Sequence, residues 1–528
     1  MGAVDYIWLG VLAVFQGPEL FSVAGLSIPV TLAMILAGFV LGIVVGATPG
    51  LAGPMAMAIS LPILISVFGF TPDALLPVFG FLVGVMKGAT VGGAVPAILF
   101  NTPGTPDAFM TTLDGHPMTK RGQSGKALRV AHFSSASGDT FSDLVLFLCA
   151  PFLAILVERY LDLPEKTALL ILSLAFIASV MGRSVGKGLI ALGLGLLVAM
   201  VGTGEEFYPR LSLGTETLSD GFPVVTVILG VLILGEVFKS LEALWFGDTR
   251  DAAVKNAAIT GDQRLHGADI RRLLPYISRS AVIGTCIGAL PGIGSTLAAT
   301  LGYTTGRQLH ARRNPEGPTF GEGVPEGIAA TEAANSSVSG ANLIPVLSLG
   351  IPGNAAAVFL ILAADSIGGF NPGPSVFRLT PDTVNPEAVI AFGLFTTMLI
   401  ANLVNWTLGG LFMRGVGIMI RVPRHILLPI VLLLTLTSIY VQETDLSAIW
   451  IAIAFGVLGY LMRLLDISPL PFVIAFILGG TLEDTARQAF SATGGDPFFL
   501  FSSVTAAIFM GLAVLVIGVS IRNSKDHP

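Results

Sequence analysis

The sequence predicts an all-α polytopic membrane protein of roughly 12 spans, built from two inverted repeats with Gly/Pro-broken re-entrant hairpins. Three observations predict this fold class. Only 12% of the 528 residues are charged, whereas about a quarter of the residues of a soluble protein are charged. The mean hydropathy of the chain is +0.82. A helix-breaking Gly/Pro signature also occurs at corresponding places in the two halves of the sequence.

Apolar runs are spread along the whole chain, and with their flanks they approach the roughly 20 residues that a helix needs to cross a bilayer. The clearest runs are 27–47, 221–234, 388–410, 426–441 and 499–520. A transmembrane β-barrel would instead show short segments of alternating hydrophobicity. The runs therefore favour a bundle of transmembrane helices.

In each half a row of glycines at four-residue spacing runs into the first of the Pro-Gly broken elements: Gly42, Gly46 and Gly50 in the first half, Gly284, Gly288 and Gly292 in the second. Each half carries two such broken elements: Gly46-Ala47-Thr48-Pro49-Gly50 and Asn101-Thr102-Pro103-Gly104-Thr105 in the first half, Gly288-Ala289-Leu290-Pro291-Gly292 and Gly350-Ile351-Pro352-Gly353-Asn354 in the second. When Pro103 is aligned with Pro352, a second row of small residues is also duplicated: Gly84, Gly88 and Gly92 fall opposite Ala333, Ser337 and Ala341. Small residues at this spacing let helix backbones approach closely, so an internal duplication is predicted.

The charges of the connecting loops indicate that the two copies face opposite sides of the membrane. The loop after the first break is free of Lys and Arg in the first half but basic in the second, and after the second break the asymmetry reverses. The basic residues are Arg307, Arg312 and Arg313 in the second half, and Lys120, Arg121, Lys126 and Arg129 in the first. Basic loops are cytoplasmic by the positive-inside rule. We therefore expect a first repeat with accessory helices at 1–238, a cytoplasmic linker at 239–272 and a second repeat with accessory helices at 273–528.

A Pro-Gly break inside a membrane leaves backbone N–H and C=O groups unpaired, and these must face protein or a water-filled cavity. Exposed helix N-termini favour a carboxylate, while freed carbonyls favour Na⁺. One break alone is more often a proline kink with small residues for packing, but four in matching positions favour a binding site. The predicted substrate-binding residues are Thr48, Pro49, Gly50, Asn101, Thr102, Pro103, Gly104, Thr105, Pro291, Gly292, Gly294, Ser295, Thr296, Gly350, Pro352, Gly353 and Asn354.

Two further features inside apolar segments are candidates for the same site. Lys87 lies in the middle of such a segment, where a charge is expensive and by default functional. It either contacts the substrate or forms a permanent pair with a carboxylate such as Glu332. The predicted cation-binding residues are Asn335, Ser336, Ser337 and Asn342, although close helix packing explains Ser and Asn nearly as well.

The stretch 113–122 is predicted to be a polar loop, because Asp114-Gly115 and His116-Pro117 are turn dipeptides. No complete nucleotide-binding loop, zinc motif or nucleophile–base constellation occurs in the sequence. We therefore expect neither an enzyme nor a transition-metal site, no cofactor beyond a coupling ion, and no nucleic-acid partner.

At these residues the chain resembles the large membrane subunit of tripartite tricarboxylate transporters, the TctA family. The resemblance rests on the four broken elements together with Asp114-Gly115-His116-Pro117-Met118 and Gly369-Phe370-Asn371-Pro372-Gly373-Pro374. It implies a multi-pass permease of the bacterial inner membrane, with a small four-helix membrane subunit and a periplasmic solute-binding protein as partners. It also implies uptake of citrate or a related carboxylate, driven by a Na⁺ or H⁺ gradient, through an elevator-like motion. The oligomeric state stays open, with a homodimer as one alternative.

Two other functions compete with binding-protein-dependent uptake. The chain is alternatively a membrane receptor or scaffold that senses a periplasmic binding protein without moving solute. A passive channel is a third hypothesis. A channel would conduct its solute without any dependence on an ion gradient.

Overall fold

The computed structural model describes residues 3–17, 19–23, 26–48, 52–181, 184–203, 209–211, 218–246, 263–291, 294–378, 383–413 and 424–526. The chain divides into two compact units, and each is formed by two separate stretches of sequence. Unit 1 comprises Met1–Ala154 and Arg250–Pro423, and unit 2 comprises Ile155–Thr249 and Arg424–Pro528. Each predicted half therefore contributes to both units. The repeat boundaries at 238 and 273 stay a prediction.

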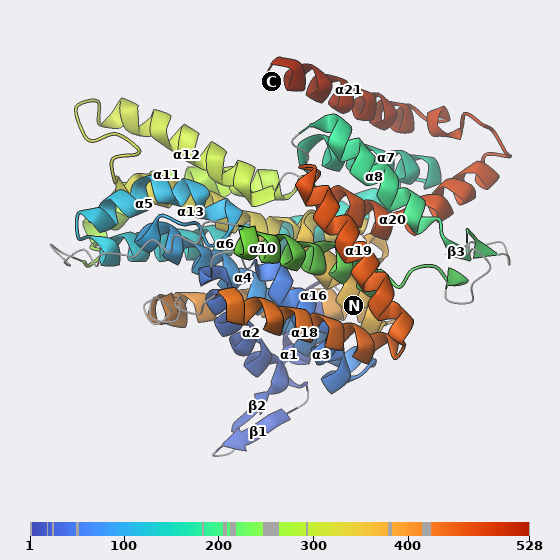
Figure 1. The fold of residues 1–528 in the computed structure, drawn as a ribbon, viewed down its shortest axis with the longest axis horizontal. Helices are drawn as coiled ribbons and strands as arrows, with labels where there is room; N and C mark the ends of the chain where they lie inside the picture. Colours follow the sequence, from blue (N-terminus) through green and yellow to red (C-terminus); the bar gives the residue numbers. More distant parts are fainter. Residues whose placement is uncertain are drawn as a thin grey trace. The chain divides into compact units, whose positions relative to one another are not determined.

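Within its described residues, the first stretch of unit 1 contains helices and one short antiparallel hairpin as regular secondary structure (Figure 1). Its elements are α1 (Ala3–Phe15), β1 (Glu19–Val23), β2 (Leu26–Pro29), α2 (Val30–Ala47), α3 (Gly53–Phe68), η1 (Pro72–Ala74), α4 (Leu75–Phe100), η2 (Pro106–Ala108), α5 (Phe109–Lys120) and α6 (Ser124–Tyr160), which leaves the unit after Ala154. The predicted apolar run 27–47 thus begins as a strand and becomes helical at Val30.

Helices are the regular secondary structure in the described residues of the second stretch of unit 1, and irregular segments connect them (Figure 1). Its elements are α11 (Gly267–Gly288), α12 (Gly294–Arg313), α13 (Pro325–Ala341), α14 (Leu343–Leu349), α15 (Ala355–Ile367), η5 (Pro374–Phe377), α16 (Pro386–Val404) and the π-helical segment η6 (Asn405–Gly409). Of the predicted linker 239–272, residues 247–262 lie outside the described residues, and α11 already begins at Gly267.

Helices α2 and α4 pack together through glycines on both partners. A Cβ at Gly42 or Gly46 of α2 would overlap backbone atoms of α4, and a Cβ at Gly88 or Gly92 of α4 would overlap backbone atoms of α2. The corresponding pair in the second stretch is α11 on α13, where a Cβ at Gly284 would overlap the backbone of α13. The small-residue rows therefore bring helix backbones into contact, as the sequence predicted.

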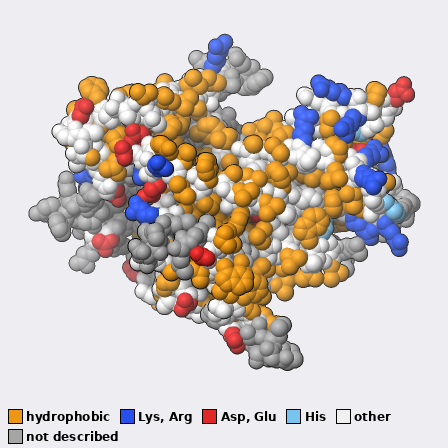
Figure 2. All heavy atoms as spheres, turned by 180° about the vertical axis from the view of Figure 1, so that it is seen from behind, with side chains coloured by type: hydrophobic (Ala, Val, Ile, Leu, Met, Phe, Trp, Pro, Cys, Tyr) orange, Lys and Arg blue, Asp and Glu red, His pale blue; other side chains and the backbone are white. Residues whose placement is uncertain are grey.

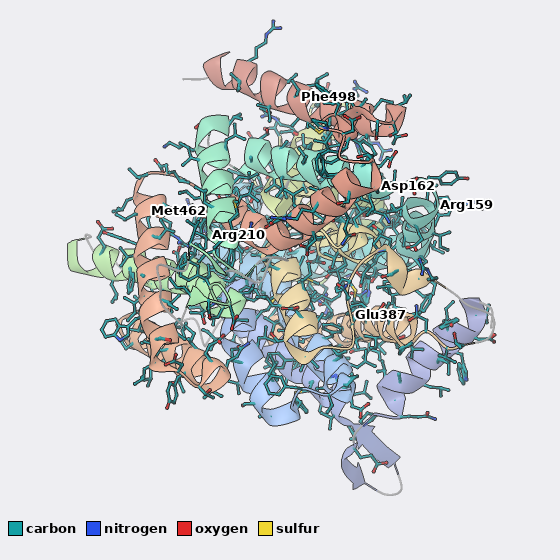
Figure 3. All side chains as sticks on the ribbon, turned by 90° about the vertical axis from the view of Figure 1, so that its right-hand side faces the viewer. Arg159, Asp162, Arg210, Glu387, Met462 and Phe498 are labelled. Carbon is teal, nitrogen blue, oxygen red and sulfur yellow. The ribbon has the colours of Figure 1, made fainter. Side chains whose placement is uncertain are left out.

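Unit 2 contains the remaining helices and a second short hairpin. Its elements are α7 (Leu163–Met181), α8 (Val185–Ala199), β3 (Gly202–Thr203), β4 (Pro209–Arg210), α9 (Val224–Ile228), the π-helical segment η4 (Leu229–Leu234), α10 (Gly235–Phe246), α18 (Arg424–Glu443), α19 (Leu446–Leu464), α20 (Pro469–Ala492), η7 (Phe499–Phe501) and α21 (Val504–Asp526). Arg210 of the hairpin, labelled in Figure 3, forms a two-pronged ion pair with Glu483 of α20, with both N–O distances below 3 Å.

Seven helices of the described part of the chain are long and apolar enough to cross a membrane. They are Val30–Ala47, Pro72–Phe100, Ser124–Tyr160, Val224–Glu242, Pro386–Met413, Leu446–Leu464 and Val504–Arg522. Shorter apolar helices, such as Gly53–Phe68 and Ala355–Ile367, follow the chain breaks. Figure 2 shows many apolar side chains on the surface and a group of neighbouring Lys and Arg side chains. The protein is therefore a multi-pass α-helical membrane protein.

The stretch 113–122 corrects one prediction. It is not a loop, because 113–120 belong to helix α5, in which both proposed turn dipeptides are helical. Asp114 explains the difference. Its buried carboxylate accepts hydrogen bonds from the N–H groups of Gly321, Gly323 and Val324 and from the hydroxyl of Tyr303. These tertiary contacts hold α5 against the turn before α13 and override the local turn preference.

Candidate functional site

The two chain breaks of the first half lie next to each other. Helix α2 ends at Ala47, and Thr48 caps it by donating its hydroxyl hydrogen bond to the carbonyl of Val44 at 2.8 Å. Gly104 of the second break packs against the end of α2 so closely that a Cβ there would overlap the carbonyl oxygen of Gly46. Its N–H also donates to the carbonyl of Gly93 in α4. The break that begins at Thr48 and the break that contains Gly104 are therefore neighbours in the fold.

The second break of each half ends its helix in the same way. Asn101 after α4 has φ 55° and Gly350 after α14 has φ 72°, which is the left-handed conformation of a helix C-terminal cap. The next N–H, of Thr102 or of Ile351, reaches back to the carbonyl of the aligned proline, Pro96 or Pro345. The two aligned segments thus share their backbone hydrogen bonds as well as their sequence pattern.

Asn342 lies between the two breaks of the second half. Its neighbour Ala341 contacts Gly288 at the end of α11, and its own amide oxygen lies directly over Gly353. The side chain is 1% exposed, and neither its oxygen nor its nitrogen has a hydrogen-bond partner among the described residues. A buried amide without partners costs free energy, so Asn342 is the strongest of the four predicted cation-binding residues as a ligand-binding group.

Segments that follow the breaks also contact each other across the two halves. Thr296, in the first turn of α12, donates a 2.6 Å hydrogen bond to Asp107 of η2, directly after the break at 101–105. Helix α15, which follows the break at 350–354, packs against α3, which follows the break at 48–52. The segment after one break of each half therefore packs against the segment after the other break of the opposite half.

The predicted substrate-binding residues differ in exposure. Pro49, Gly50 and Gly292 lie outside the described residues. The remaining ones fall into three groups: Asn101, Thr102 and Thr296 are exposed; Thr48, Pro103, Thr105, Pro291, Gly294, Ser295, Gly350 and Asn354 are half-buried; Gly104, Pro352 and Gly353 are buried. Asn354 is also a helix cap, because its side chain accepts the N–H of Ala357 at the start of α15. The exposed and half-buried groups stay accessible to a ligand.

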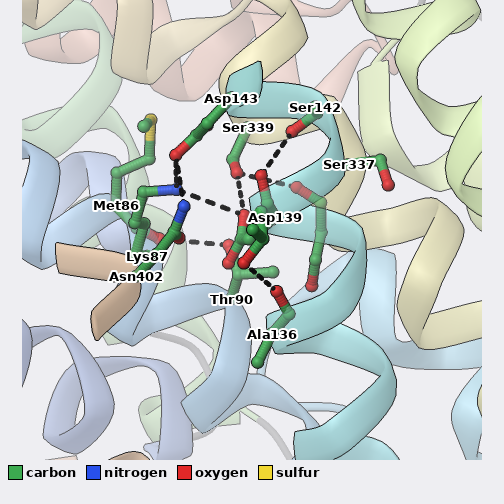
Figure 4. A network of polar contacts seen from close by, with 12 residues as sticks. Met86, Lys87, Thr90, Ala136, Asp139, Ser142, Asp143, Ser337, Ser339 and Asn402 are labelled. Carbon is green, nitrogen blue, oxygen red and sulfur yellow. Dashed lines mark hydrogen bonds and ion pairs between the residues drawn. The ribbon is translucent and has the colours of Figure 1, made fainter. Parts of the chain in front are cut away.

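Lys87 sits in a fully buried ionic cluster with two carboxylates of α6 (Figure 4). Its Nζ is 2.7 Å from Oδ2 of Asp143 and 3.5 Å from Oδ1 of Asp139, and both Lys87 and Asp139 are 0% exposed. The suggested partner Glu332 is therefore wrong. The Glu332 carboxylate instead accepts the hydroxyl of Thr111 in α5. The negative charges that balance the buried ammonium of Lys87 therefore come from α6 and not from α13, which carries Glu332.

Polar side chains from two further helices complete this cluster (Figure 4). The amide nitrogen of Asn402 in α16 donates to Oδ2 of Asp143 at 2.7 Å, and the hydroxyl of Ser339 in α13 donates to Asp139. Ser336, a predicted cation-binding residue, hydrogen-bonds to Ser135 of α6. Ser337 instead donates to the carbonyl of Ala333 in its own helix, which agrees with the packing alternative for that residue. Asn335 is buried on the same helix.

Glycines let α6 approach α13 closely at the cluster. A Cβ at Gly340 of α13 would overlap Oδ1 of Asp143, and a Cβ at Gly138 of α6 would overlap the carbonyl oxygen of Ala333. The small residues of α13 therefore serve the charged cluster as well as the contact with α11.

Sequence reasoning missed Asp139, Asp143 and Asn402. A usable signal existed, because Asp139 and Asp143 are four residues apart and so share one face of a helix. They also directly precede the apolar stretch 144–157. The basic and polar start of α6 hides the segment from a search for apolar runs.

The sequence of this chain is similar to known protein families and relatives. A family model described as "Tripartite tricarboxylate transporter TctA family" matches residues 32–474, which include all four breaks and the charged cluster. The chain belongs to this family. It is therefore a subunit of a tripartite tricarboxylate transporter, a system that also includes a binding protein and a small membrane subunit.

Two relatives of this TctA family member come from Agrobacterium vitis. One, an uncharacterized 52.8 kDa protein in the TAR-I ttuC' 3' region, is 31% identical over 510 residues, which cover 94% of this chain and 95% of the relative. The other, an uncharacterized protein in the TAR-II ttuC' 3' region, is 30% identical over 252 residues, which cover 46% of this chain and 98% of the relative. No solved structure matches the chain. Membership places the chain in a family of transporters rather than of enzymes.

Proposed function

We propose that this TctA family member is the large permease subunit of a binding-protein-dependent secondary transporter, which takes up citrate or a related carboxylate on a Na⁺ or H⁺ gradient. The observation that carries the proposal is the clustering of the paired breaks within unit 1. Gly104 lies on Gly46, Ala341 contacts Gly288 while the adjacent Asn342 contacts Gly353, and Thr296 bonds to Asp107. Paired interruptions of this kind form the substrate sites of secondary transporters.

Helix ends at the breaks supply the chemistry for an anion. Helices α3, α12 and α15 each begin directly after a break, and a helix N-terminus carries about half a positive charge. Their N–H groups orient a carboxylate without a fixed charge that would trap it. The N-terminus of α12 already faces Asp107 through Thr296, so a bound carboxylate would compete with that contact.

The mirrored contacts support an inverted repeat. In this scheme α2, α3 and α4 of the first half correspond to α11, α12 and α13–α14 of the second. The contact between α15 and α3 then corresponds to the contact of α12 with η2 and α5. An axis that exchanges the halves relates such pairs, and the opposite loop charges agree with an axis in the membrane plane. In this scheme the basic end of unit 1, where Arg121 bonds to the carbonyl of Glu322 and Lys126 pairs with Asp269, faces the cytoplasm of a bacterial inner membrane. An elevator-type motion would carry the hairpins across.

Uptake into proteoliposomes tests the proposal. Vesicles contain the full chain and its small membrane subunit, the binding protein is added outside, and labelled citrate and other di- and tricarboxylates are offered with Na⁺ or proton gradients. Pro103→Ala and Pro352→Ala should each lower the initial rate by about tenfold, equivalent to about 1.4 kcal/mol, while membrane insertion stays normal. The matched control is Pro429→Ala, which removes an exposed proline inside α18 of unit 2.

Unchanged uptake in both break variants would reject the site. Absence of accumulation in the wild type with every acid would favour the alternative of a receptor or scaffold for the binding protein. Accumulation that needs no gradient would indicate a channel. The identity of the acid follows from the affinity of the binding protein for the same panel, and the number of subunits from the mass of the purified complex.

A further inference from the structure

The charges of the buried cluster on α4 and α6 do not balance. One ammonium, Lys87, faces two carboxylates, Asp139 and Asp143, and none of the three is more than 3% exposed. Lys87 is the only cation that pairs with either carboxylate in the described part of the chain. An uncompensated buried charge costs several kcal/mol. The cluster is therefore one positive charge short.

The two carboxylates are not equivalent. Oδ2 of Asp143 lies 2.7 Å from the ammonium and accepts the Asn402 amide at 2.7 Å, so the negative charge of Asp143 is the better compensated of the two. Asp139 is farther from the ammonium, at 3.5 Å, and its Oδ1 accepts the hydroxyl of Ser339. A neutral carboxylic acid is therefore least costly at Asp139.

The same cluster contains three buried oxygens without a hydrogen-bond partner in the described part of the chain, an observation that does not depend on the charge balance. Oδ2 of Asp139 is buried and has no hydrogen-bond partner among the described residues. The same is true of Oδ1 of Asp143 and Oδ1 of Asn402. Buried polar atoms without partners are unusual in native proteins and call for a missing proton, ion or water. This cluster thus has both a missing charge and free sites to receive it.

We propose that Asp139 binds the proton that couples transport to the proton gradient, with Lys87 and Asp143 holding the balancing ion pair. The inference rests on the transport function proposed above and names its coupling ion. In the step, a proton from one side of the membrane bonds to Oδ2 of Asp139, and the carboxylate becomes a neutral acid. The same O–H bond breaks on the other side and returns the proton to water. No other bond changes.

The surroundings of Asp139 favour a proton over Na⁺. The charged and titratable groups that face it are Lys87 from α4 and Asp143 from its own helix, whereas α13 contributes Ser339 and α16 contributes Asn402. A Na⁺ ion here would lie beside the ammonium, and two unit charges about 4 Å apart repel by about 4 kcal/mol at an effective dielectric constant of about 20. A proton sits on one oxygen and needs no coordination shell.

Transport by reconstituted vesicles tests the proposal. The wild type should accumulate labelled citrate, or whichever acid of the panel it carries, on an inward proton gradient without Na⁺, and the vesicle lumen should acidify. Asp139→Asn should lose this accumulation by tenfold or more yet still exchange internal for external substrate, because exchange needs no net proton movement. The matched control is Ser137→Ala, two residues away on α6, where the hydroxyl bonds to the carbonyl of Phe133 in its own helix.

The outcomes separate the two proposals. A wild type without exchange or accumulation contradicts the transport function, whereas proton-driven accumulation retained in Asp139→Asn overturns the assignment of Asp139 alone. Accumulation by the wild type on a Na⁺ gradient only also overturns it.

A second measurement does not depend on transport. In infrared difference spectra of the purified full chain between acidic and alkaline buffer, the wild type and Ser137→Ala should show a protonated-carboxyl C=O band that Asp139→Asn lacks. If Asp139→Asn does not fold, Asp139→Glu replaces it and should shift the band. A spectrum identical to that of the wild type overturns the proposal.

Discussion

Unit 1 contains a fully buried ion-pair cluster in addition to a partly exposed pair, Lys126 with Asp269, whereas the described ion pairs of unit 2 are partly exposed. In unit 1 the Lys87 and Asp139 side chains are both 0% exposed. In unit 2 the ion pairs keep contact with solvent, since the Glu236 partner of Arg463 is 36% exposed and the Arg210 partner of Glu483 is 31% exposed. Charges inside a membrane protein are expensive and are retained for function, whereas half-exposed pairs mainly fasten elements together. The buried cluster agrees with the proposal that the transport chemistry lies in unit 1.

Glycines make close helix contacts in both units, because a Cβ at Gly195 of α8 or Gly459 of α19 in unit 2 would also overlap a backbone carbonyl of a neighbouring helix. Gly42 and Gly88 of unit 1 stand where a Cβ would overlap the backbone of the neighbouring helix. Gly193 of α8 and Gly511 of α21 in unit 2 have nothing within 4 Å of the Cβ position. The spanning window of α4 is 89% buried and that of α21 is 11% buried. Close helix contact therefore depends on where a glycine stands in its helix, and Gly193 and Gly511 stand at positions without such a contact.

The largest expected effect comes from removing the buried cation. Lys87→Met leaves two buried carboxylates facing each other and should destabilise the protein by about 3–5 kcal/mol. Thermal unfolding of the purified chain in detergent measures it. Arg210→Met of unit 2 is the comparison, because Arg210 is 31% exposed and its partner Glu483 keeps a second ion pair with Arg487, so the loss should be clearly smaller.

The net charge of the cluster provides a second test of this prediction. In the double variant Lys87→Met/Asp143→Asn only Asp139 is ionisable, and its protonation leaves the cluster neutral. We expect it to regain much of the stability that Lys87→Met loses. If Lys87→Met folds as well as the wild type and only binds substrate more weakly, the ammonium serves the substrate directly and the contrast between the units fails.

Close helix contact gives the next effect. Gly88→Ala forces α4 away from the carbonyl of Phe39 in α2 and should cost about 1–3 kcal/mol, typical of overpacking. Gly193→Ala in α8 meets no atom and should be neutral or stabilise its helix by up to about 1 kcal/mol. The same unfolding measurement decides, and equal effects of the two variants would contradict the packing difference.

Replacing the Asn342 side chain should lower transport without lowering stability. Asn342→Leu removes two buried polar atoms that have no partner among the described residues, so the unfolding midpoint should stay constant or rise slightly. The uptake rate should nevertheless fall by about tenfold or more if this side chain binds substrate or cation beside Gly353. Asn402→Leu is the matched control, because it removes a hydrogen bond to Asp143 and should lower the midpoint as well. Normal uptake by Asn342→Leu would exclude it from the site.

The sequence predicted the helical class, the family and the position of the breaks, because apolar length, Gly/Pro pattern and four-residue spacing are local features of the chain. It did not predict which carboxylates pair with Lys87, since that depends on which helix packs against α4. Asp139 and Asp143 belong to a helix whose start carries Lys126 and Arg129, and this lowers its apparent hydropathy. The helix at 109–120 was missed for the related reason that Asp114 bonds to a turn about 200 residues away in sequence.

The smallest effect is expected at the opposite extreme of burial, in the exposed turn before α19 of unit 2. Asp445 caps this helix by accepting the hydroxyl and the N–H of Ser447, and these hydrogen bonds hold the pKa of Asp445 below its usual 3.8. A depressed pKa stabilises the fold above the usual pKa, and the contribution is lost as the pH falls through the lower value of the folded state. Asp445→Ala should therefore lower the unfolding midpoint slightly at neutral pH, and this difference from the wild type should shrink only below about pH 3.8. Ser184→Ala, which removes the uncharged cap of α8, should lower the midpoint by an amount that does not change with pH, and a parallel pH-independent loss in Asp445→Ala would show that the carboxylate charge plays no part.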